Sequence, residues 1–514
     1  MLSSFALTKT MRLLAVLTLL SLASLGGNPE QGRQGSGADN IVEGFSGNEV
    51  ADEVDGGTIS GGGQVSFPNL VTLDFGVVAG GKGNVAGNYS TVSGGESNSA
   101  EGIRAVIGGG AKNIASRNSA VVGGGYSNTA NQSFSTVGGG KVNTANGSYT
   151  TIAGGAGNLA TGRISTIGGG TRNQTQSAYA TVGGGSFNLA IGGTSTIAGG
   201  TQNHAAGIGS FIGGGAGNQV TGLQSVIAGG LSNRVTDNYS VVIGGRQNVA
   251  GNGNDEEEDT PYAIVSGGYE NQAGGAYSTV PGGYGNQALG DYSFAVGNQA
   301  QVDSDHPGAF LFADSSDATF ESSAPNEFAA RATGGVRFVT AIDENGAPLV
   351  GVRLSQGSGS WETLSDRDAK GSVLPVDGRQ VLDVLMTVPI STWQYKGQSE
   401  AVRHMGPMAQ DFYSAFDLGQ DEHYISGVDA DGVALASIQG LYQLVQKQEA
   451  QIKVLQAENV SQLEQLDALD ARISRLEQGN DRTGSPLNVI LLAGLCLMTG
   501  LLIGQRKTKN TAVI

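Results

Sequence analysis

The sequence predicts a mainly β protein in which a solenoid of 15-residue repeats is followed by an α+β domain, a coiled coil and a C-terminal transmembrane helix. Asparagines recur every 15 residues from Asn98 to Asn248, and so strict a period is typical of a solenoid. Nine residues after each of the first ten asparagines stands a Val or Ile, itself two residues after a small Ser, Thr or Ala. This is strand alternation with one apolar side chain facing inward. We assign the following glycines and the asparagine to turns, because both residue types tolerate positive φ.

One coil offers a single large aliphatic side chain, which is too little buried area to offset the entropy of ordering 15 glycine-rich residues. We therefore expect neighbouring chains to complete the core. From Asn84 to Asn298 the pattern resembles the left-handed β-roll heads of trimeric autotransporter adhesins. The resemblance implies a homotrimer in which three rolls pack their apolar faces around a common axis. Deletion of residues 371–478 should then leave the repeats unfolded.

Changes of composition along the chain divide it into eight segments. We expect a signal peptide (1–23), an N-terminal segment (24–80), the repeat β-roll (81–300), a β-rich neck (301–359), a chaperone and autoprotease domain (360–437), a coiled coil (438–478), a transmembrane helix (487–504) and a basic cytoplasmic tail (505–514).

Both ends of the chain indicate export and a membrane anchor. Lys9 and Arg12 precede an apolar run over 13–20 and small residues near Ala23, the layout of a secretory signal peptide. Residues 487–503 form an apolar run just long enough to span a bilayer, and the basic tail follows it. We expect a cell-surface or secreted fibre with a single-pass anchor.

Composition also excludes several functions. A net charge of −17 without a basic patch argues against nucleic acid. The single Cys496 forms no intrachain disulfide, and the histidines show no ligand spacing, so we predict no metal site and no cofactor. The acidic run Asp255–Asp259 interrupts the period, and we assign it to a solvated loop rather than to an ion site.

Three motifs distinguish the C-terminal third: Trp361 to Lys370, Pro389 to Lys396, and Gly406 to Phe412. In order and spacing they resemble the endosialidase-type intramolecular chaperone domain of phage tailspikes and tail fibres, over about 360–448. The resemblance implies that Ser365 is a nucleophile, that Lys370 is its base, and that the chain cuts itself between Leu364 and Ser365.

The chemistry of such a pair is reasonable. A serine hydroxyl is a weak nucleophile until a base takes its proton, and a lysine is a base only where desolvation favours its neutral form. Burial at a subunit interface would supply that desolvation. The alternative is an uncleaved chaperone in which Ser365 caps a turn and Lys370 is solvated. We assign Asp366 and Asp368 to capping, and leave His404 without a role.

A heptad pattern follows from Ile438 to Leu476, with nine of its twelve seam positions apolar, and it indicates a coiled coil. Gln448, Asn459 and Gln462 lie in the seam, where polar residues fix register.

The preferred function is therefore a structural or adhesive homotrimeric fibre that assembles and releases itself, with a cell-surface or glycan receptor as a further partner. An uncleaved membrane-tethered adhesin is the first alternative. A glycan hydrolase is less favoured, because Glu96, Glu101 and Asp237 are spread along the repeats rather than paired. An ice- or crystal-binding face built on recurring Ser-Thr pairs is the weakest, because we expect those residues to be buried.

Overall fold

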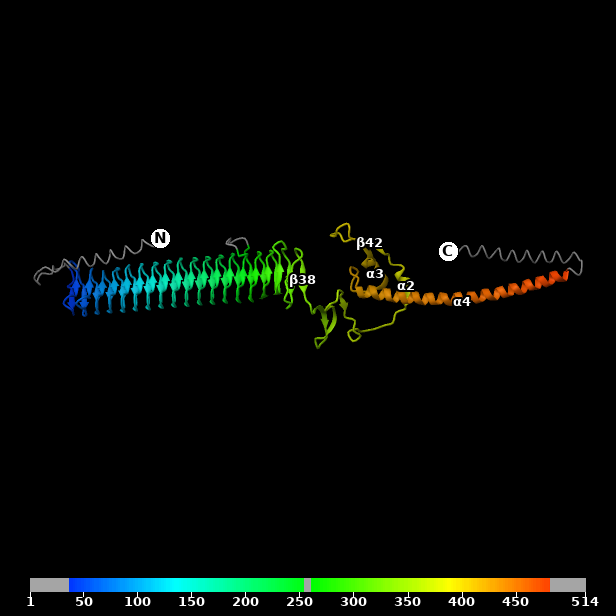
Figure 1. Cartoon of the computed structure of the whole chain (residues 1–514), viewed down its shortest axis with the longest axis horizontal. Coiled ribbons are helices and arrows are strands. Elements are labelled where there is room, and N and C mark those ends of the chain that lie inside the picture. The colour runs from blue at the N-terminus through cyan, green and yellow to red at the C-terminus, as the bar shows by residue number, and fades with distance from the viewer. Residues whose placement is uncertain (1–36, 254–259, 481–514) are drawn as a thin grey trace. The chain divides into compact units, whose positions relative to one another are not determined.

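The computed structural model describes residues 37–253 and 260–480, which form a solenoid (37–336) and a C-terminal unit (337–480) (Figure 1). The predicted signal peptide (1–23), transmembrane helix (487–504), basic tail (505–514) and acidic run Asp255–Asp259 lie outside the described residues. Within the described ranges, no helix combines the length and the apolar character that crossing a bilayer requires.

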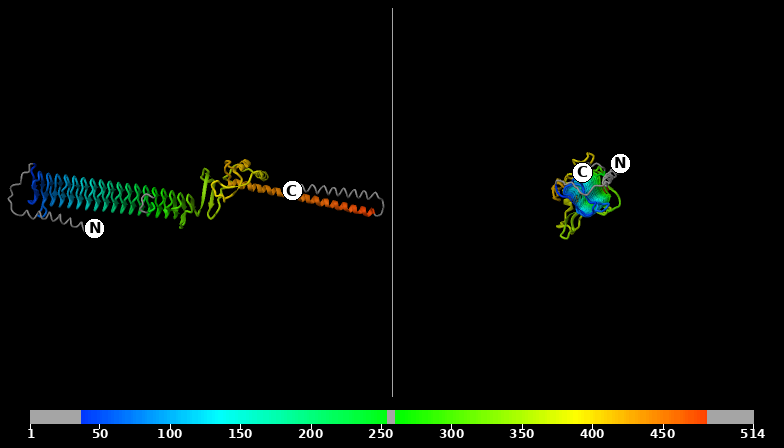
Figure 2. Two further views of the ribbon diagram at one scale, coloured as in Figure 1. Left: turned by 90° about the horizontal axis from the view of Figure 1, so that it is seen from above. Right: turned by 90° about the vertical axis from the view of Figure 1, so that its left-hand side faces the viewer.

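The solenoid consists of two parallel sheets, A and B, and each strand pairs with the equivalent strands one turn earlier and one turn later. The turns are stacked at regular spacing in the left-hand view of Figure 2. Val121 of sheet A, for example, pairs with Val106 and Thr136, and Ile114 of sheet B with Ser99 and Thr129. The predicted parallel solenoid is thus confirmed.

The strands of sheet A are β1 (Ile41–Glu43), β3 (Thr58–Ser60), β5 (Val77–Val78), β7 (Thr91–Val92), β9 (Val106–Ile107), β11 (Val121–Val122), β13 (Thr136–Val137), β15 (Thr151–Ile152), β17 (Thr166–Ile167), β19 (Thr181–Val182), β21 (Thr196–Ile197), β23 (Phe211–Ile212), β25 (Val226–Ile227), β27 (Val241–Val242), β29 (Ile264–Val265), β31 (Thr279–Val280), β32 (Gly283–Tyr284), β34 (Phe294–Asn298), β36 (Phe310–Ala313) and β38 (Phe328–Arg331). Those of sheet B are β2 (Glu49–Val50), β4 (Leu70–Val71), β6 (Val85–Ala86), β8 (Ser99–Ala100), β10 (Ile114–Ala115), β12 (Thr129–Ala130), β14 (Thr144–Ala145), β16 (Leu159–Ala160), β18 (Gln174–Thr175), β20 (Leu189–Ala190), β22 (His204–Ala205), β24 (Gln219–Val220), β26 (Arg234–Val235), β28 (Val249–Ala250), β30 (Gln272–Ala273), β33 (Gln287–Ala288), β35 (Ala300–Val302) and β37 (Phe320–Glu321).

In most two-residue strands of the solenoid the first side chain points outward and the second is buried, and β2, β32 and β37 depart from this pattern. Between the sheets, each turn adds one bridge residue that pairs with its equivalents, such as Tyr126 with Ala111 and Lys141. The Ser-Thr pairs divide accordingly: Ser135 is buried, whereas Thr136 lies on the outer face of sheet A. The expectation that both residues of such a pair are buried was therefore wrong for the threonine.

The core of the solenoid is closed within one chain, which corrects the expectation that neighbouring chains must complete it. Ile107, Asn113, Ala115 and Ala120 are all fully buried in the single chain, and the same positions are buried along the rod. The interior is narrow enough for Ala, Ser and Asn to fill the space that one large aliphatic residue leaves. Counting only large side chains therefore underestimates the core.

The period asparagines are not turn residues with positive φ, which corrects a second expectation. Positive φ occurs at the third glycine, as in Gly125 (92°), and at the residue before the asparagine, as in Ser127 (58°). Asn128 itself is buried and donates from Nδ2 to the carbonyls of Gly124 and Gly140. Glycine is required at position 125 because a Cβ there would lie 2.2 Å from the carbonyl oxygen of Gly140.

The solenoid extends beyond the predicted limits of 81–300, from Ile41 to Arg331. Its end turns lack the 15-residue step: Ile41 pairs with Thr58 and Thr58 with Val77. At the other end, Phe310 pairs with Phe328. Longer connections conceal these turns from a search for a fixed period.

The C-terminal unit contains two small sheets and three helices. Its strands are β39 (Gly335–Ile342), β40 (Pro348–Ser355) and β41 (Glu362–Thr363) in one sheet and β42 (Ser391–Trp393) with β43 (His404–Gly406) in the other; its helices are α2 (Gly378–Leu385), α3 (Ala409–Phe416) and α4 (Gly427–Asn480).

Helix α2 packs against the first turns of α4, and Asp377 caps its N-terminus by accepting a hydrogen bond from the Arg379 N–H. A Cβ on Gly440 would lie 2.1 Å from the carbonyl oxygen of Gly378, so the two backbones meet at these glycines. Val433 and Ala436 are buried on the same side of α4 as Gly440. The heptad region 438–478 is helical as predicted, and its association into a coiled coil stays a prediction.

Candidate functional site

The predicted scissile bond lies where the chain leaves a sheet. Strand β41 pairs with β40 in antiparallel register, with Val352 opposite Thr363 and Arg353 opposite Glu362. The Leu364 N–H donates to the carbonyl of Gly351 at 2.9 Å. Leu364 is therefore held by a ladder hydrogen bond, and Ser365 is the first residue of the loop that follows.

A tight loop then returns the chain toward Ser365. The Asp368 N–H donates to Asp366 Oδ1 at 3.0 Å, and the Lys370 N–H donates to the Arg367 carbonyl at 3.1 Å. As a result, Lys370 Nζ donates to Ser365 Oγ at 2.5 Å. The structure thus brings together the two residues that the sequence singled out, and Asp366 stabilises the turn between them.

Both side chains are exposed in the single chain. In this arrangement Lys370 donates to the Ser365 hydroxyl and does not accept its proton. A lysine can activate a serine only in an environment that favours its neutral form. The described chain therefore shows the contact between the two side chains in an exposed setting.

Residues 365–418 match the family model described as chaperone of endosialidase. The match confirms the predicted resemblance of this segment, and its first residue is Ser365 itself. No curated protein matches the chain.

The other two motifs of the chaperone-of-endosialidase segment contribute to two separate aromatic contacts. Trp393 of β42 stacks on His404 of β43, with ring centroids 4.8 Å apart, and His404 Nε2 lies 2.9 Å from Gln398 Oε1. Phe412 of α3 is buried and contacts Phe416. These contacts give His404 a packing role between the strands.

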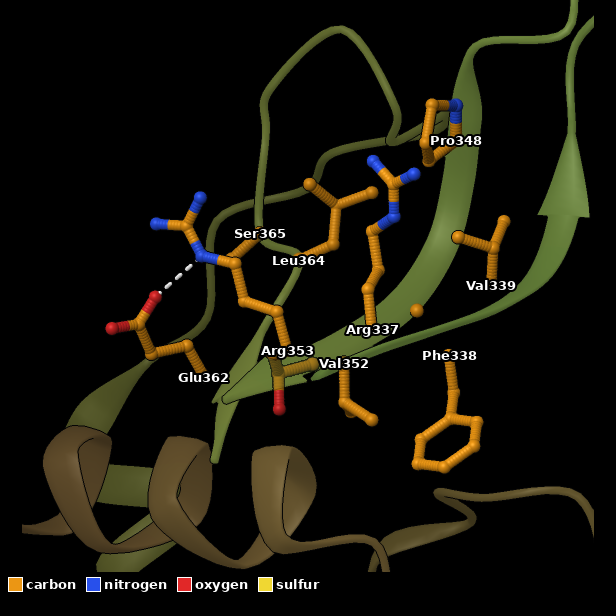
Figure 3. Close-up of a pocket in the computed structure, with 11 residues that line it drawn as sticks. Arg337, Phe338, Val339, Pro348, Val352, Arg353, Glu362, Leu364 and Ser365 are labelled. Carbon is orange, nitrogen blue, oxygen red and sulfur yellow. Dashed lines mark hydrogen bonds and ion pairs between the residues drawn. The ribbon is translucent and has the colours of Figure 1, made fainter. Parts of the chain in front are cut away.

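A pocket of about 350 Å³ lies beside the bond between Leu364 and Ser365 (Figure 3). Leu364 and Ser365 line it together with Arg337 of β39 and Arg353 of β40. Figure 3 shows the side chains of Arg337 and Leu364 next to each other at the pocket. The reasoning from sequence missed both arginines, because β-sheet register rather than sequence spacing brings them to Ser365.

An ion pair joins β40 to β41, the strand that precedes the bond between Leu364 and Ser365. Arg353 Nε donates to Glu362 Oε2 at 2.6 Å, and Ser355 Oγ donates to the same oxygen at 3.1 Å. The hydrogen bond from Arg353, followed by that from Ser355, lowers the pKa of the Glu362 carboxyl. One residue of opposite charge on each of two facing strands is the signal that could have revealed this cross-strand pair.

Proposed function

We propose that the C-terminal unit assembles three copies of the chain into a fibre and then cuts each chain once, before Ser365. The main support for cleavage is the 2.5 Å contact between Lys370 Nζ and Ser365 Oγ. Ser365 is also the first residue of the segment that matches the chaperone of endosialidase. A serine and a lysine held together at the start of a chaperone segment support self-cleavage.

The proposed reaction consumes one water molecule. Neutral Lys370 takes the proton of the Ser365 hydroxyl while Oγ attacks the carbonyl carbon of Leu364. The bond from that carbon to the Ser365 nitrogen breaks, and the nitrogen takes the proton back from Lys370. An ester between Leu364 and Ser365 Oγ results. Water then hydrolyses the ester, leaving a carboxylate on Leu364 and a free amine on Ser365.

The exposed seam of α4 supports assembly. Ile438 and Leu455 are 62% and 56% exposed in the single chain, and Val445 and Ile452 between them are exposed as well. A helix of 54 residues draws its stability mainly from packing of an apolar face, which most of α4 lacks in one copy. Heptad spacing of these residues favours helices of further copies as partners.

Assembly would also activate the site. Packing of three C-terminal units would remove water from Lys370 and favour its neutral form, so that cleavage follows trimer formation. With the signal peptide and the anchor helix expected at 1–23 and 487–504, cleavage would release an exported fibre and leave the chaperone in the membrane. Whether the fibre is adhesive depends on a cell-surface or glycan receptor.

Cleavage is tested by mass analysis of the expressed, exported chain. We expect the wild type to yield a fragment beginning at Ser365, and Ser365→Ala and Lys370→Ala to abolish cleavage while trimers still form. Ser360→Ala and Lys396→Ala are matched controls, because both residues are exposed and lie outside the site. An intact wild-type chain that behaves like the two mutants would reduce the unit to a chaperone without proteolysis and favour the uncleaved adhesin.

A further inference from the structure

The sheet of β39, β40 and β41 would stay with the solenoid after a cut before Ser365. All three strands precede the proposed cleavage point, whereas Lys370 follows it. Hydrolysis of the ester joins the oxygen of water to the carbonyl carbon of Leu364 and returns one hydrogen of that water to Ser365 Oγ. The other hydrogen leaves as a proton when the new acid ionises. A negative charge therefore appears on Leu364, and the nearby lysine belongs to the other fragment.

Arg337 places a positive charge beside that new chain end. It lines the pocket of about 350 Å³ together with Leu364 and Ser365, and Figure 3 shows its side chain beside that of Leu364. Arg353, the second arginine of the pocket, has its charge offset by the ion pair with Glu362. Among the ion pairs in the part of the chain that the structure describes, none involves Arg337. Its guanidinium is therefore positioned to bind a carboxylate that forms at the pocket.

Gly351 offers the same chain end a backbone donor. It lies opposite Leu364 in the antiparallel ladder, where the Leu364 N–H donates to the Gly351 carbonyl at 2.9 Å. In a pair of this kind, the N–H of the opposite residue points back at the carbonyl of the first. Among the described residues, this return bond from the Gly351 N–H to the Leu364 carbonyl is not formed. A donor thus faces the oxygen that becomes one of the two carboxylate oxygens.

The lack of a side chain at Gly351 also keeps the pocket open between β39 and β41. Gly351 lines the pocket from the middle strand of the sheet. A Cβ at this position would lie 2.5 Å from the carbonyl oxygen of Phe338, so only a hydrogen fits there. The Arg337 side chain, which starts on β39, therefore meets no side chain of residue 351 on the way to Leu364.

We infer that this pocket is a binding site for the carboxylate that cleavage creates on Leu364. Arg337 binds the carboxylate through charge-assisted hydrogen bonds, and the Gly351 N–H donates to the oxygen that was the Leu364 carbonyl. The inference rests on the proposed cleavage and assigns a ligand to the pocket beside it. Binding of the carboxylate holds the last strand of the released fibre on its sheet. It also favours the hydrolysed product over the ester, which carries no charge.

Trimming by a carboxypeptidase tests the site on the full chain after self-cleavage. This enzyme removes C-terminal residues, so its rate reports how firmly Leu364 is held at the end of the cut chain. Arg337→Gln removes the charge, and Arg337→Lys keeps a charge without the planar fork of the guanidinium. Arg163→Gln is the matched control, because Arg163 is an exposed arginine of the solenoid. Mass analysis should show that Arg337→Gln loses Leu364 about two to five times faster than wild type and the control, with Arg337→Lys between them.

Salt gives a second measurement on the same samples. It screens the attraction between the guanidinium and the carboxylate, so the ratio of trimming rates between Arg337→Gln and wild type should fall toward one as ionic strength rises. Trimming of the wild type should also speed up with salt relative to a free peptide of residues 360–364, which makes this measurement independent of any variant.

The outcomes separate this inference from the proposed cleavage. Equal trimming of wild type and Arg337→Gln at low salt, in chains that have been cut after Leu364, overturns the inference and leaves cleavage standing. Faster trimming of Arg337→Gln that does not change with salt indicates lost packing and overturns the inference as well. A wild-type chain that stays intact overturns the proposed cleavage, and the inference with it.

Discussion

Each period asparagine acts as a three-way hydrogen-bond connector between turns. Asn158 Nδ2 donates to the carbonyls of Gly154 and Gly170 at 2.9 and 3.0 Å, and its Oδ1 accepts from the Asn173 N–H at 2.9 Å. The side chain is fully buried, so no water can replace these partners. An asparagine supplies two donors and an acceptor in one planar group, which explains why the position recurs without substitution through the regular turns.

Replacing Asn158 should loosen the turns around it. Asn158→Ala leaves the Gly154 carbonyl and the Asn173 N–H without partners, at about 1 to 3 kcal/mol for each buried group, while the Gly170 carbonyl still accepts from the Ala156 N–H. Asn158→Asp should destabilise more, because it removes both donors and buries a charge. Hydrogen exchange of the strands near residue 158 measures the local free energy of opening. Asn131→Ala is the control, since Asn131 is exposed; equal loss of protection in both variants would contradict the connector role.

Asp314 gives the last turns of the solenoid a pH dependence. Its Oδ2 accepts from Thr333 Oγ1 and N at 2.6 and 2.7 Å, and its Oδ1 accepts from Arg331 Nε at 3.0 Å. The two hydrogen bonds from Thr333 contribute most to lowering the pKa of the Asp314 carboxyl. A carboxyl with a lowered folded-state pKa stabilises the fold above its ordinary pKa and loses that contribution as the pH falls.

Asp314→Asn should therefore loosen β36 and β38 at neutral pH and matter less in acid. The rate of pepsin cleavage in these strands, taken as the ratio of variant to wild type, should be high near about pH 5 and should fall progressively as the pH drops below the ordinary aspartate pKa of about 3.9. Asp305→Asn is a control on a nearby exposed carboxylate. A ratio that stays constant with pH would rule out the contribution of Asp314.

At the scale of elements, the periodic parts of the sequence predicted the elements that repeat one local structure. The solenoid and the helical heptad region could be predicted because each repeats one local environment many times. The end turns and the first part of α4 could not, since they depend on particular partners. Gly440, for instance, allows α2 to approach α4, and nothing in the heptad identifies that contact.

The candidate site, too, was predicted only in part from the sequence. Lys370 follows Ser365 by five positions, and the family resemblance predicted the pair that the turn brings together. The pocket could not be predicted, because Arg337 reaches it from β39. Strand β40 lies between β39 and β41 in the sheet, and only the folded sheet shows that Arg337 and Leu364 line the same pocket.

At the scale of the whole molecule, folding of the solenoid and association of copies are separable. The sequence led us to expect unfolded repeats after loss of residues 371–478, on the premise that three chains share one core. Each turn instead buries its own aliphatic, alanine and asparagine side chains and bonds to the turns on either side. The proposed association of copies would then join solenoids that each chain already forms by itself.

A chain limited to residues 37–336 should accordingly fold as a monomer at low concentration. Solenoid stability is the sum of the turns and their nearest-neighbour contacts, none of which needs the C-terminal unit. Its circular dichroism should show β structure with a cooperative thermal transition, and its mass in solution should be that of one chain. The full chain, which has the α4 seam, should be trimeric under the same conditions. A truncated chain without β structure would restore the view that the core is shared among three copies.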